Sequence, residues 1–508
     1  MTAPPIHRWF DDVARAARAR PALRTPDRDT TFGELADGSD ELAGRLAGLG
    51  CAGPDRIAIL SGDHATITAA MLGVLKAGCA FAPLELAAAE HRLAQQLGAL
   101  GCRAIVVDAA SRARVPAAAR ALPAIELDGA RPVGPPGASR APAPADDPDA
   151  PCSVYFTSGS TGAPRAILGR LAGIAHHIRW ELDHLGLDAS VRGSILHAPS
   201  YDAYLPDVLV PACAGGVACA PAARELVLDP PRLCAWLERE AITLLHCVPS
   251  LFRGLLACPG AARLTALRYV LLAGEVVRPA DVRAAREVLG DRVRLVNLYG
   301  PSEATLVKLH HELTAADAGR AAVPIGVPMP GVTVHLLDDD GSPCPPGVTG
   351  QIAIQSAYGA LGYLGDPDLT RARFLAAPDG SGEQLYLTGD DGRLLPDGTL
   401  AFHGRRDRQI KLWGARVDLD EVEAILCSCD GVLEAAVVAE HDAVLRGFVV
   451  LGESAAMARV REQAQQRLAP AMRLAWLTRL DALPRTPSGK IDRRRISADH
   501  AVAPPEAP

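Results

Sequence analysis

The chain has 508 residues, of which 49% are hydrophobic and 22% are charged, and its formal net charge is −7. This length exceeds one ordinary domain, and the composition is typical of soluble globular proteins. The negative charge argues against a nucleic-acid partner, and no apolar run is long enough to span a membrane.

The chain begins MTAPPIHRWFDD, without a basic region followed by an apolar one, so we expect no secretory signal. Its 12 cysteines are scattered, and no two are spaced as Cys-x-x-Cys. Neither a zinc site nor a disulfide framework is therefore indicated. We expect a reducing, cytoplasmic location.

Helical and strand patterns alternate over residues 1–130, which predicts an α/β sheet. We predict helices over 32–48 and 65–77 and strands over 56–60, 80–84 and 104–108. Another helix is expected between the last two strands. Residues 131–150 are rich in Pro and Ala and are predicted to form a surface linker.

After the linker the α/β pattern resumes and continues to about residue 330. Residues 331–403 carry short strands separated by Gly, Pro and Asp turns, which predicts a β subdomain. The fold class is therefore α/β: a large N-terminal core of α/β sheets plus a β subdomain, with a small α+β C-terminal domain. We place the boundaries at 1–406 for the core, 407–497 for the C-terminal domain and 498–508 for a disordered tail.

A glycine motif at residues 48–53 matches G-x-G-x-x-G. A dinucleotide-binding motif needs a strand before it and a helix after it. Here a helical pattern precedes the glycines and a strand pattern follows them, which favours a turn at the end of a helix. The motif therefore argues against an NAD-dependent oxidoreductase.

A second glycine-rich stretch, TSGSTGAPRA, runs from Thr157 to Ala166. Backbone N–H groups in such a turn can bind an anion, and the hydroxyls add donors. No Gly-Lys-Ser/Thr ends the stretch, so it is not a Walker A loop. By itself, the pattern fits a phosphate-binding loop and a flexible polar loop equally well.

This stretch resembles the phosphate loop of the adenylate-forming superfamily, which includes amino-acid adenylation domains, acyl-CoA synthetases and luciferases. The usual form ends in Pro-Lys-Gly, and here Arg165 and Ala166 replace the last two residues. Arginine keeps the charge and can bind phosphate through two N–H groups. Further segments resemble the superfamily's motifs in order over nearly the full length: Leu75–Glu85, Asn297–Glu303, Tyr386–Asp390, Gly404–Lys411 and Pro487–Asp492.

The resemblance implies that ATP and Mg²⁺ are the cofactors. Tyr299 would lie against adenine, Glu303 would hold Mg²⁺, and Asp390 with Arg405 would bind the ribose. The acidic neighbour Asp391 is not predicted to bind the ribose, because the Tyr-x-Thr-Gly pattern directly precedes Asp390. The implied ATP-binding positions are Thr157, Ser158, Gly159, Ser160, Thr161, Gly162, Arg165, Gly274, Glu275, Asn297, Tyr299, Gly300, Ser302, Asp390 and Arg405.

Lys490 is the catalytic residue that the resemblance implies. A carboxylate attacks the α-phosphate of ATP, and an ammonium that touches both reactants stabilises the transition state. A general base is not needed, because a carboxylate is already a nucleophile at neutral pH. The alternative is an exposed lysine in a basic tail, since three arginines follow at 493–495.

The superfamily rotates its small C-terminal domain between adenylation and thiol transfer, so residues 407–497 would form a mobile lid that carries Lys490. Asp407 would be the hinge. Gly414 would line the thiol tunnel, where another chain must approach closely. The superfamily often has Arg before that glycine, whereas this chain has Trp413.

Asp202 falls where amino-acid adenylation domains carry an aspartate that pairs with the substrate's α-ammonium. The resemblance places the side-chain pocket at Ala203, Pro206, His246, Leu271, Ala273, Leu298, Leu306 and Val307. This set offers no charge to oppose a charged side chain, which predicts a neutral substrate. Proline is favoured, and alanine and serine remain open.

The sequence therefore resembles a stand-alone adenylation enzyme of the nonribosomal-peptide-synthetase type. We expect it to form an aminoacyl-AMP and to load a separate carrier protein through its phosphopantetheine thiol. Two alternatives remain: a CoA ligase for a non-amino acid, and a nucleotide-binding relative without turnover. The departures at Arg165, Ala166 and Trp413 motivate the second alternative.

Overall fold

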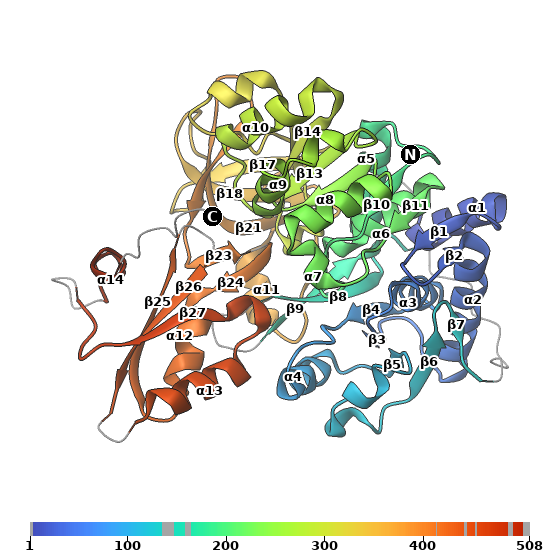
Figure 1. Cartoon of the computed structure of the whole chain (residues 1–508), viewed down its shortest axis with the longest axis horizontal. Coiled ribbons are helices and arrows are strands. Elements are labelled where there is room, and N and C mark those ends of the chain that lie inside the picture. Colours follow the sequence, from blue (N-terminus) through green and yellow to red (C-terminus); the bar gives the residue numbers. More distant parts are fainter. Residues whose placement is uncertain are drawn as a thin grey trace. The chain divides into compact units, whose positions relative to one another are not determined.

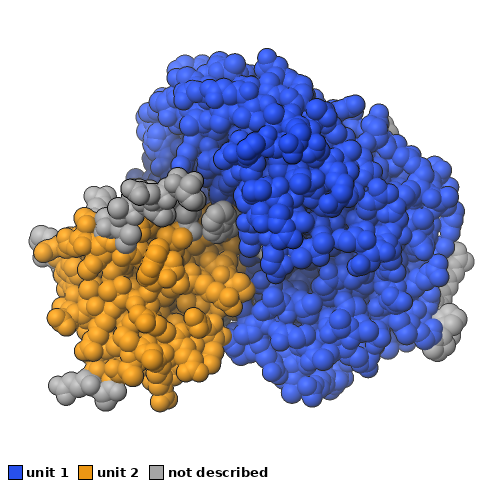
Figure 2. Space-filling model, in the orientation of Figure 1, with its two compact units in different colours: residues 1–156, 166–406 blue, residues 157–165, 407–508 orange. Residues whose placement is uncertain are grey.

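The computed structural model describes residues 4–134, 147–157, 164–412, 414–440, 444–452, 455–485 and 491–500. The chain divides into two compact units, which Figure 2 colours separately. The first unit contains Met1–Phe156 and Ala166–Arg406, and the second contains Thr157–Arg165 and Asp407–Pro508.

The described first unit contains a nine-stranded sheet, in the order β16-β15-β14-β13-β12-β10-β11-β1-β2. Adjacent strands from β10 to β14 run parallel, and β15 and β16 complete one edge in antiparallel fashion. The bounds are β1 Pro21–Arg24, β2 Asp29–Thr31, β10 Arg192–Ser194, β11 Val217–Cys219, β12 Leu244–Cys247, β13 Tyr269–Ala273, β14 Arg294–Tyr299, β15 Leu309–Leu313 and β16 Val327–Pro328.

Helices cover this sheet on both faces. One face packs against α5 (Leu171–Leu185) and α6 (Tyr204–Ala214), and its core includes Leu271 and Leu298. The other face packs against α8, α9 and α10, through residues such as Leu272. The bounds of these three helices and of the short α7 are Pro230–Arg239, Pro249–Leu256, Pro279–Leu289 and Arg224–Val227.

A second large sheet has eight strands in the order β19-β9-β8-β4-β3-β5-β6-β7 among the described residues. Its bounds are β3 Arg56–Leu60, β4 Ala80–Pro83, β5 Ala104–Val107, β6 Ala124–Asp128, β7 Arg131–Pro132, β8 Pro151–Thr157, β9 Arg165–Arg170 and β19 Gly362–Tyr363. The N-terminal helices are α1 Ile6–Ala17, α2 Phe32–Gly48, α3 His64–Lys76 and α4 Glu90–Leu100 (Figure 1).

The β subdomain expected after residue 330 is present as a five-stranded antiparallel sheet. Its strands are β17 Val332–Leu337, β18 Gly350–Ser356, β20 Phe374–Ala376, β21 Gln384–Leu394 and β22 Leu400–Arg405, and α11 Pro367–Arg373 interrupts them. The hairpin of β21 and β22 pairs Asp390 with Arg405, which brings two distant motif residues together.

The second unit, taken by itself, is a small α+β structure in its described part. It contains a β23-β24 hairpin and the three-stranded sheet β25-β26-β27. The bounds are β23 Gln409–Leu412, β24 Ala415–Asp418, α12 Leu419–Cys427, β25 Val432–Glu440, β26 Val444–Leu451, α13 Met457–Arg467, β27 Leu474–Arg479 and α14 Arg493–Asp499.

Local signals explain why several elements match their predicted ranges. The helix α2 begins after a capping box, in which Thr31 Oγ1 accepts from the Glu34 amide at 3.2 Å and Glu34 accepts from the Thr31 amide at 2.9 Å. It ends at Gly48, and Gly50 follows with a φ of 73°. The G-x-G-x-x-G motif is therefore a helix-ending turn.

One boundary differs from the prediction. The helix α14 continues to Asp499, so the first residues of the predicted disordered tail are helical. Asp492 caps this helix by accepting from the Arg495 amide at 3.0 Å, which stabilises its first turn. No helix among the described residues combines the length and the apolar character needed to cross a membrane.

Candidate functional site

Tyr299, Asp390 and Arg405 form one hydrogen-bonded group in the first unit. The Tyr299 hydroxyl donates to Asp390 Oδ2 at 2.5 Å, and Arg405 forms an ion pair with the other carboxylate oxygen. Burial, together with the charge of Asp390, raises the pKa of Tyr299 well above its ordinary value, so the phenol remains a donor. Three of the predicted ATP-binding residues therefore come together although they lie on different strands.

Two other residues of the Asn297–Glu303 motif hold neighbouring segments of the chain in place. The Asn297 side chain is buried and donates to the Pro324 carbonyl at 2.7 Å. Gly300 lies so close to the segment before β15 that a Cβ would be 2.5 Å from Val307 Cα. A larger residue at 300 would displace the segment that carries Leu306 and Val307.

Glu303 is buried, and its Oε1 accepts from the Tyr363 hydroxyl at 2.9 Å. Among the described residues, no group of three or more His, Cys, Asp and Glu side chains could hold a metal by itself. A single buried carboxylate fits Mg²⁺, which is commonly held by one or two carboxylates together with substrate phosphates.

Gly274 and Glu275 follow β13. Gly274 has a φ of 91°, in the region that favours glycine. Glu275 accepts from the amide and the hydroxyl of Ser250, both at 2.8 Å, at the start of α9. The Glu275 carboxylate thus holds a helix terminus in this structure.

The structure describes only part of the predicted phosphate loop. Thr157 ends β8 and Arg165 begins β9, and these are neighbouring strands of the eight-stranded sheet. The other predicted positions of this loop lie outside the described residues: Ser158, Gly159, Ser160, Thr161 and Gly162. Lys490 and Trp413 also lie outside them.

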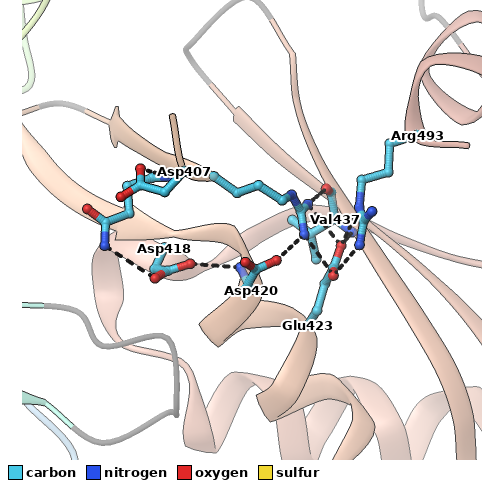
Figure 3. Close-up of polar contacts among 8 residues, drawn as sticks. Asp407, Asp418, Asp420, Glu423, Val437 and Arg493 are labelled. Carbon is cyan, nitrogen blue, oxygen red and sulfur yellow. Dashed lines mark hydrogen bonds and ion pairs between the residues drawn. The ribbon is translucent and has the colours of Figure 1, made fainter. Parts of the chain in front are cut away.

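The predicted hinge residue, Asp407, opens the second unit, and its Oδ1 accepts from the Gln409 amide at 3.2 Å. The next residue, Arg408, donates to both carboxylate oxygens of Glu423, at 2.8 and 3.0 Å. Arg493 donates to the same two oxygens at 3.0 and 2.7 Å (Figure 3). Glu423 therefore joins the segment after the hinge to the start of α14.

Gly414 is described and has a φ of 80°. It connects the strands of the β23-β24 hairpin, in which Leu412 pairs with Ala415. Glycine suits this left-handed turn position whether or not a thiol passes nearby.

Asp202 lies in the turn directly before α6 and lines a small cavity of the first unit. The cavity lining consists of Ser153, Tyr155, Ile167, Gly169, Asp202, Leu205, Ser302, Thr305 and Leu306. Ser302 and Leu306 were both expected at the site, so the structure brings the predicted ammonium-binding carboxylate, one ATP-binding position and one pocket residue to the same cavity.

Lys308 is a buried lysine that the sequence did not single out. Its side chain has no exposed surface, and Nζ donates to the Thr305 carbonyl at 2.5 Å. Burial lowers the pKa of Lys308 to about 7, although the charge of Asp202 acts in the opposite direction. A titratable amine, hydrogen-bonded to the backbone of the lining residue Thr305, therefore lies behind the wall of the cavity.

The remaining pocket residues, apart from Val307, lie on one face of the nine-stranded sheet or at α6. Val307 lies just before β15 and packs against the same core. His246 pairs with Leu271 across β12 and β13, and Ala273 pairs with Leu298 across β13 and β14. These side chains face the core that contains α5 and α6. Ala203 immediately precedes α6, and Pro206 lies in its first turn.

His246 is held between two buried carboxylates. Its Nε2 lies 2.7 Å from Glu181 Oε1 on α5, and its Nδ1 lies 3.2 Å from Asp207 Oδ1 on α6. Burial alone would lower the pKa of His246, but the two carboxylates outweigh it and raise the pKa to about 10. The pocket set thus includes one charged group where the sequence suggested none, and each ring nitrogen lies within ion-pair distance of a carboxylate.

Asp207 also fixes the segment that leads to Asp202. Its Oδ2 accepts from the amides of Leu196 and His197 at 2.9 and 3.0 Å. Burial would raise the pKa of Asp207, but His197 and His246 lower it to about 2. The charged triad of Glu181, His246 and Asp207 therefore connects α5, β12 and α6.

Comparisons with known proteins define the family. Residues 10–364 match the model described as AMP-binding enzyme, and residues 421–490 match the model described as AMP-binding enzyme C-terminal domain. The chain belongs to the AMP-binding enzyme family. The resemblance to ATP-dependent, AMP-forming ligases of the adenylate-forming superfamily is thereby confirmed at the level of the family.

Two curated relatives are similar to this chain over almost its full length. The AMB antimetabolite synthetase AmbB of Pseudomonas aeruginosa is 34% identical over 514 residues, which cover 99% of this chain and 40% of AmbB. Malpibaldin synthetase of Mortierella alpina is 33% identical over 522 residues, which cover 98% of this chain and 9% of that protein. The chain therefore spans two fifths or less of the length of these two relatives.

A solved structure matches over almost the whole chain. It is that of holo-PA1221, an NRPS protein containing adenylation and PCP domains, bound to a vinylsulfonamide inhibitor. The TM-score is 0.85 at 26% identity, and the match covers 99% of this chain and 85% of that chain. The predicted α/β fold class, with a large N-terminal and a small C-terminal part, is confirmed.

Proposed function

We propose that this chain is an amino-acid adenylation enzyme. It activates a neutral L-amino acid with ATP to form aminoacyl-AMP and pyrophosphate. It then transfers the aminoacyl group to the phosphopantetheine thiol of a separate carrier protein, forming a thioester and releasing AMP. The observation that carries the proposal is the position of Asp202, at a cavity that Ser302 also lines.

The chemistry of this cavity suits an α-amino acid. A half-buried carboxylate such as Asp202 can pair with the α-ammonium of an amino acid. The amino-acid carboxylate then attacks the α-phosphorus of ATP. A new oxygen–phosphorus bond forms as the bond to the pyrophosphate oxygen breaks, and pyrophosphate leaves with the bonding electrons.

The nucleotide is assigned to the group of Tyr299, Asp390 and Arg405. The Asp390 carboxylate is oriented by the Tyr299 hydroxyl at 2.5 Å and by Arg405, and it would accept from the ribose hydroxyls. Mg²⁺, held by Glu303, would neutralise phosphate charge. Lys490 would stabilise the charge that develops between the carboxylate and the α-phosphate, and Asp407 would be the hinge for the second half-reaction.

The proposal of a carrier-protein step rests on the similarity of this chain to a solved NRPS protein. The similar protein holo-PA1221 contains an adenylation domain together with a PCP domain. We assign the thiol path to Gly414. The charges behind the pocket are paired within the protein, which supports a neutral side chain. By resemblance alone, the apolar pocket residues favour proline and leave alanine and serine open.

Amino-acid-dependent exchange of pyrophosphate into ATP tests the proposal. Exchange with one neutral amino acid across a panel of all proteinogenic and several imino and β-amino acids is the expected result. Asp202→Ala should abolish this exchange, while nucleotide binding persists. Dependence on free CoA and indifference to Asp202→Ala would instead identify a CoA ligase, and nucleotide binding without pyrophosphate release would identify a relative without turnover.

A further inference from the structure

Two buried hydroxyl groups belong to residues that line the cavity beside Asp202. Tyr155 and Thr305 are 5% and 6% exposed, and neither hydroxyl has a hydrogen-bond partner among the residues that the structure describes. Buried hydroxyls in proteins are usually paired. Two unpaired ones in the lining of one cavity can be satisfied by a bound group that both donates and accepts hydrogen bonds, which is a property of an ordered water and of a substrate hydroxyl.

The protein holds Thr305 in place. Thr305 and Leu306 both have positive φ values, 56° and 64°, which β-branched and bulky residues rarely adopt. The Lys308 ammonium donates to the Thr305 carbonyl at 2.5 Å. At Gly173 on α5 even a Cβ would lie 2.7 Å from Thr305 Cγ2, so the methyl group packs closely against that helix.

Tyr155 is fixed by packing rather than by a hydrogen bond. Its ring meets Phe81 edge to face, with centroids 6.4 Å apart and an interplanar angle of 86°. Burial, with a further contribution from Asp202, raises the pKa of Tyr155 well above its ordinary value. The phenol therefore keeps its proton and can donate.

We propose that Tyr155 and Thr305 determine specificity by hydrogen-bonding the side-chain hydroxyl of a small β-hydroxy amino acid, with L-serine as the simplest example. This inference rests on the proposed function. Alanine would leave both hydroxyls unpaired, and the proline ring would place methylene groups against them. The two hydroxyls therefore favour serine over the other two candidates.

The first test compares L-serine, L-alanine and L-proline as substrates of the wild-type chain in pyrophosphate exchange. Serine and alanine differ by one hydroxyl group, so they are a matched pair. We expect kcat/KM for serine to exceed that for alanine about a hundredfold, since each of two hydrogen bonds contributes roughly tenfold. This measurement needs no variant and is independent of any folding defect.

The second test removes one hydroxyl at a time. Tyr155→Phe and Thr305→Val should each lower the serine-to-alanine ratio of kcat/KM about tenfold. Thr305→Ser keeps the hydroxyl and should retain the preference. Thr30→Val is the matched control, because Thr30 also has a buried hydroxyl without a partner among the described residues but does not line the cavity.

Four outcomes would overturn the inference. Wild-type activity with alanine or proline equal to that with serine would contradict it directly. An unchanged ratio in Tyr155→Phe and Thr305→Val would also contradict it. An equal loss with serine and alanine would show that the hydroxyls contact a part that both substrates share. Silence with every amino acid would overturn the proposed function, and this inference with it.

Discussion

Asp390 is the residue on which the nucleotide assignment can be tested most directly. In Asp390→Asn, one oxygen becomes an NH₂ group that cannot accept from Arg405 or from a ribose hydroxyl. Losing a charge-assisted hydrogen bond costs about 1.5–3 kcal/mol, so the KM for ATP should rise roughly tenfold to a hundredfold. The KM for the amino acid should change much less.

Its neighbour provides the matched control. Asp391 pairs with Arg406 at 2.6 Å and is more exposed than Asp390. Asp391→Asn should leave the KM for ATP within about twofold, as expected for a partly exposed ion pair. Equal effects of the two substitutions would contradict the assignment of the ribose to Asp390.

Lys308 predicts a pH dependence of stability. Its pKa is about 7 in the folded chain and 10.5 for an ordinary lysine. Between these values the unfolded chain binds more protons, so this residue makes the free energy of unfolding rise with pH from about 7 to 10.5. Relative to Lys308→Met, the wild-type chain should therefore gain stability across this window.

Urea denaturation of both proteins at several pH values checks this expectation. His246 acts in the opposite direction: its raised pKa means that its contribution is present below about pH 6.5 and is lost as the pH approaches 10. Because His246 is present in both proteins, its effect cancels in the difference. Parallel stability curves would show that Lys308 does not titrate in this range.

At the scale of elements, Glu423 is the connection to test. It accepts from Arg408, Arg493 and the Val437 amide, the last at 2.7 Å. Burial would raise the pKa of Glu423, but these hydrogen bonds lower it. Glu423→Gln leaves two arginines facing a neutral amide, and we expect a loss of roughly 2–3 kcal/mol.

Hydrogen exchange locates this loss. Amides of α12 and β25 should exchange faster in Glu423→Gln, whereas those of the nine-stranded sheet should not. Glu462→Gln on α13 is the control, since its only described hydrogen bond is exposed and long, at 3.5 Å. Faster exchange throughout the first unit would argue against a connection local to the second unit.

The elements also show which parts of the fold the sequence determines. The range of α2 agrees with its prediction, and the structure shows why: its amphipathic pattern, capping box and terminal glycines are all local features. The contacts that shape the site are not local. His246 and Glu181 are 65 residues apart, and Tyr299 and Asp390 are 91 apart. The second pair was found only because family motifs mark both residues.

Other site residues carried no usable signal. Lys308 stands in the apolar run TLVKL, where a lysine is ordinarily an exposed member of an edge strand. Asp207 is one of several aspartates near Asp202, and no motif distinguishes it from the others. The roles of both residues depend on burial and on partners from other elements, which spacing along one chain does not reveal.

At the scale of the whole molecule, the two half-reactions can be separated. Asp202 and Asp390 belong to the first unit, and position 490 falls within the residue range of the second. If Lys490 acts only in adenylation, Lys490→Ala should slow pyrophosphate exchange by orders of magnitude. Transfer from preformed aminoacyl-AMP to a carrier thiol should be affected much less. Equal loss of both half-reactions would contradict this role.

The charged triad has a consequence for protein engineering. Leu271, Ala273 and Leu298 contribute packing alone, so each can be exchanged singly to reshape the pocket. His246 cannot be treated in this way, because its replacement by an apolar residue would leave Glu181 and Asp207 buried without their shared cation. Libraries that retarget this pocket should therefore vary Glu181, His246 and Asp207 together. The leucine and alanine positions can be varied independently.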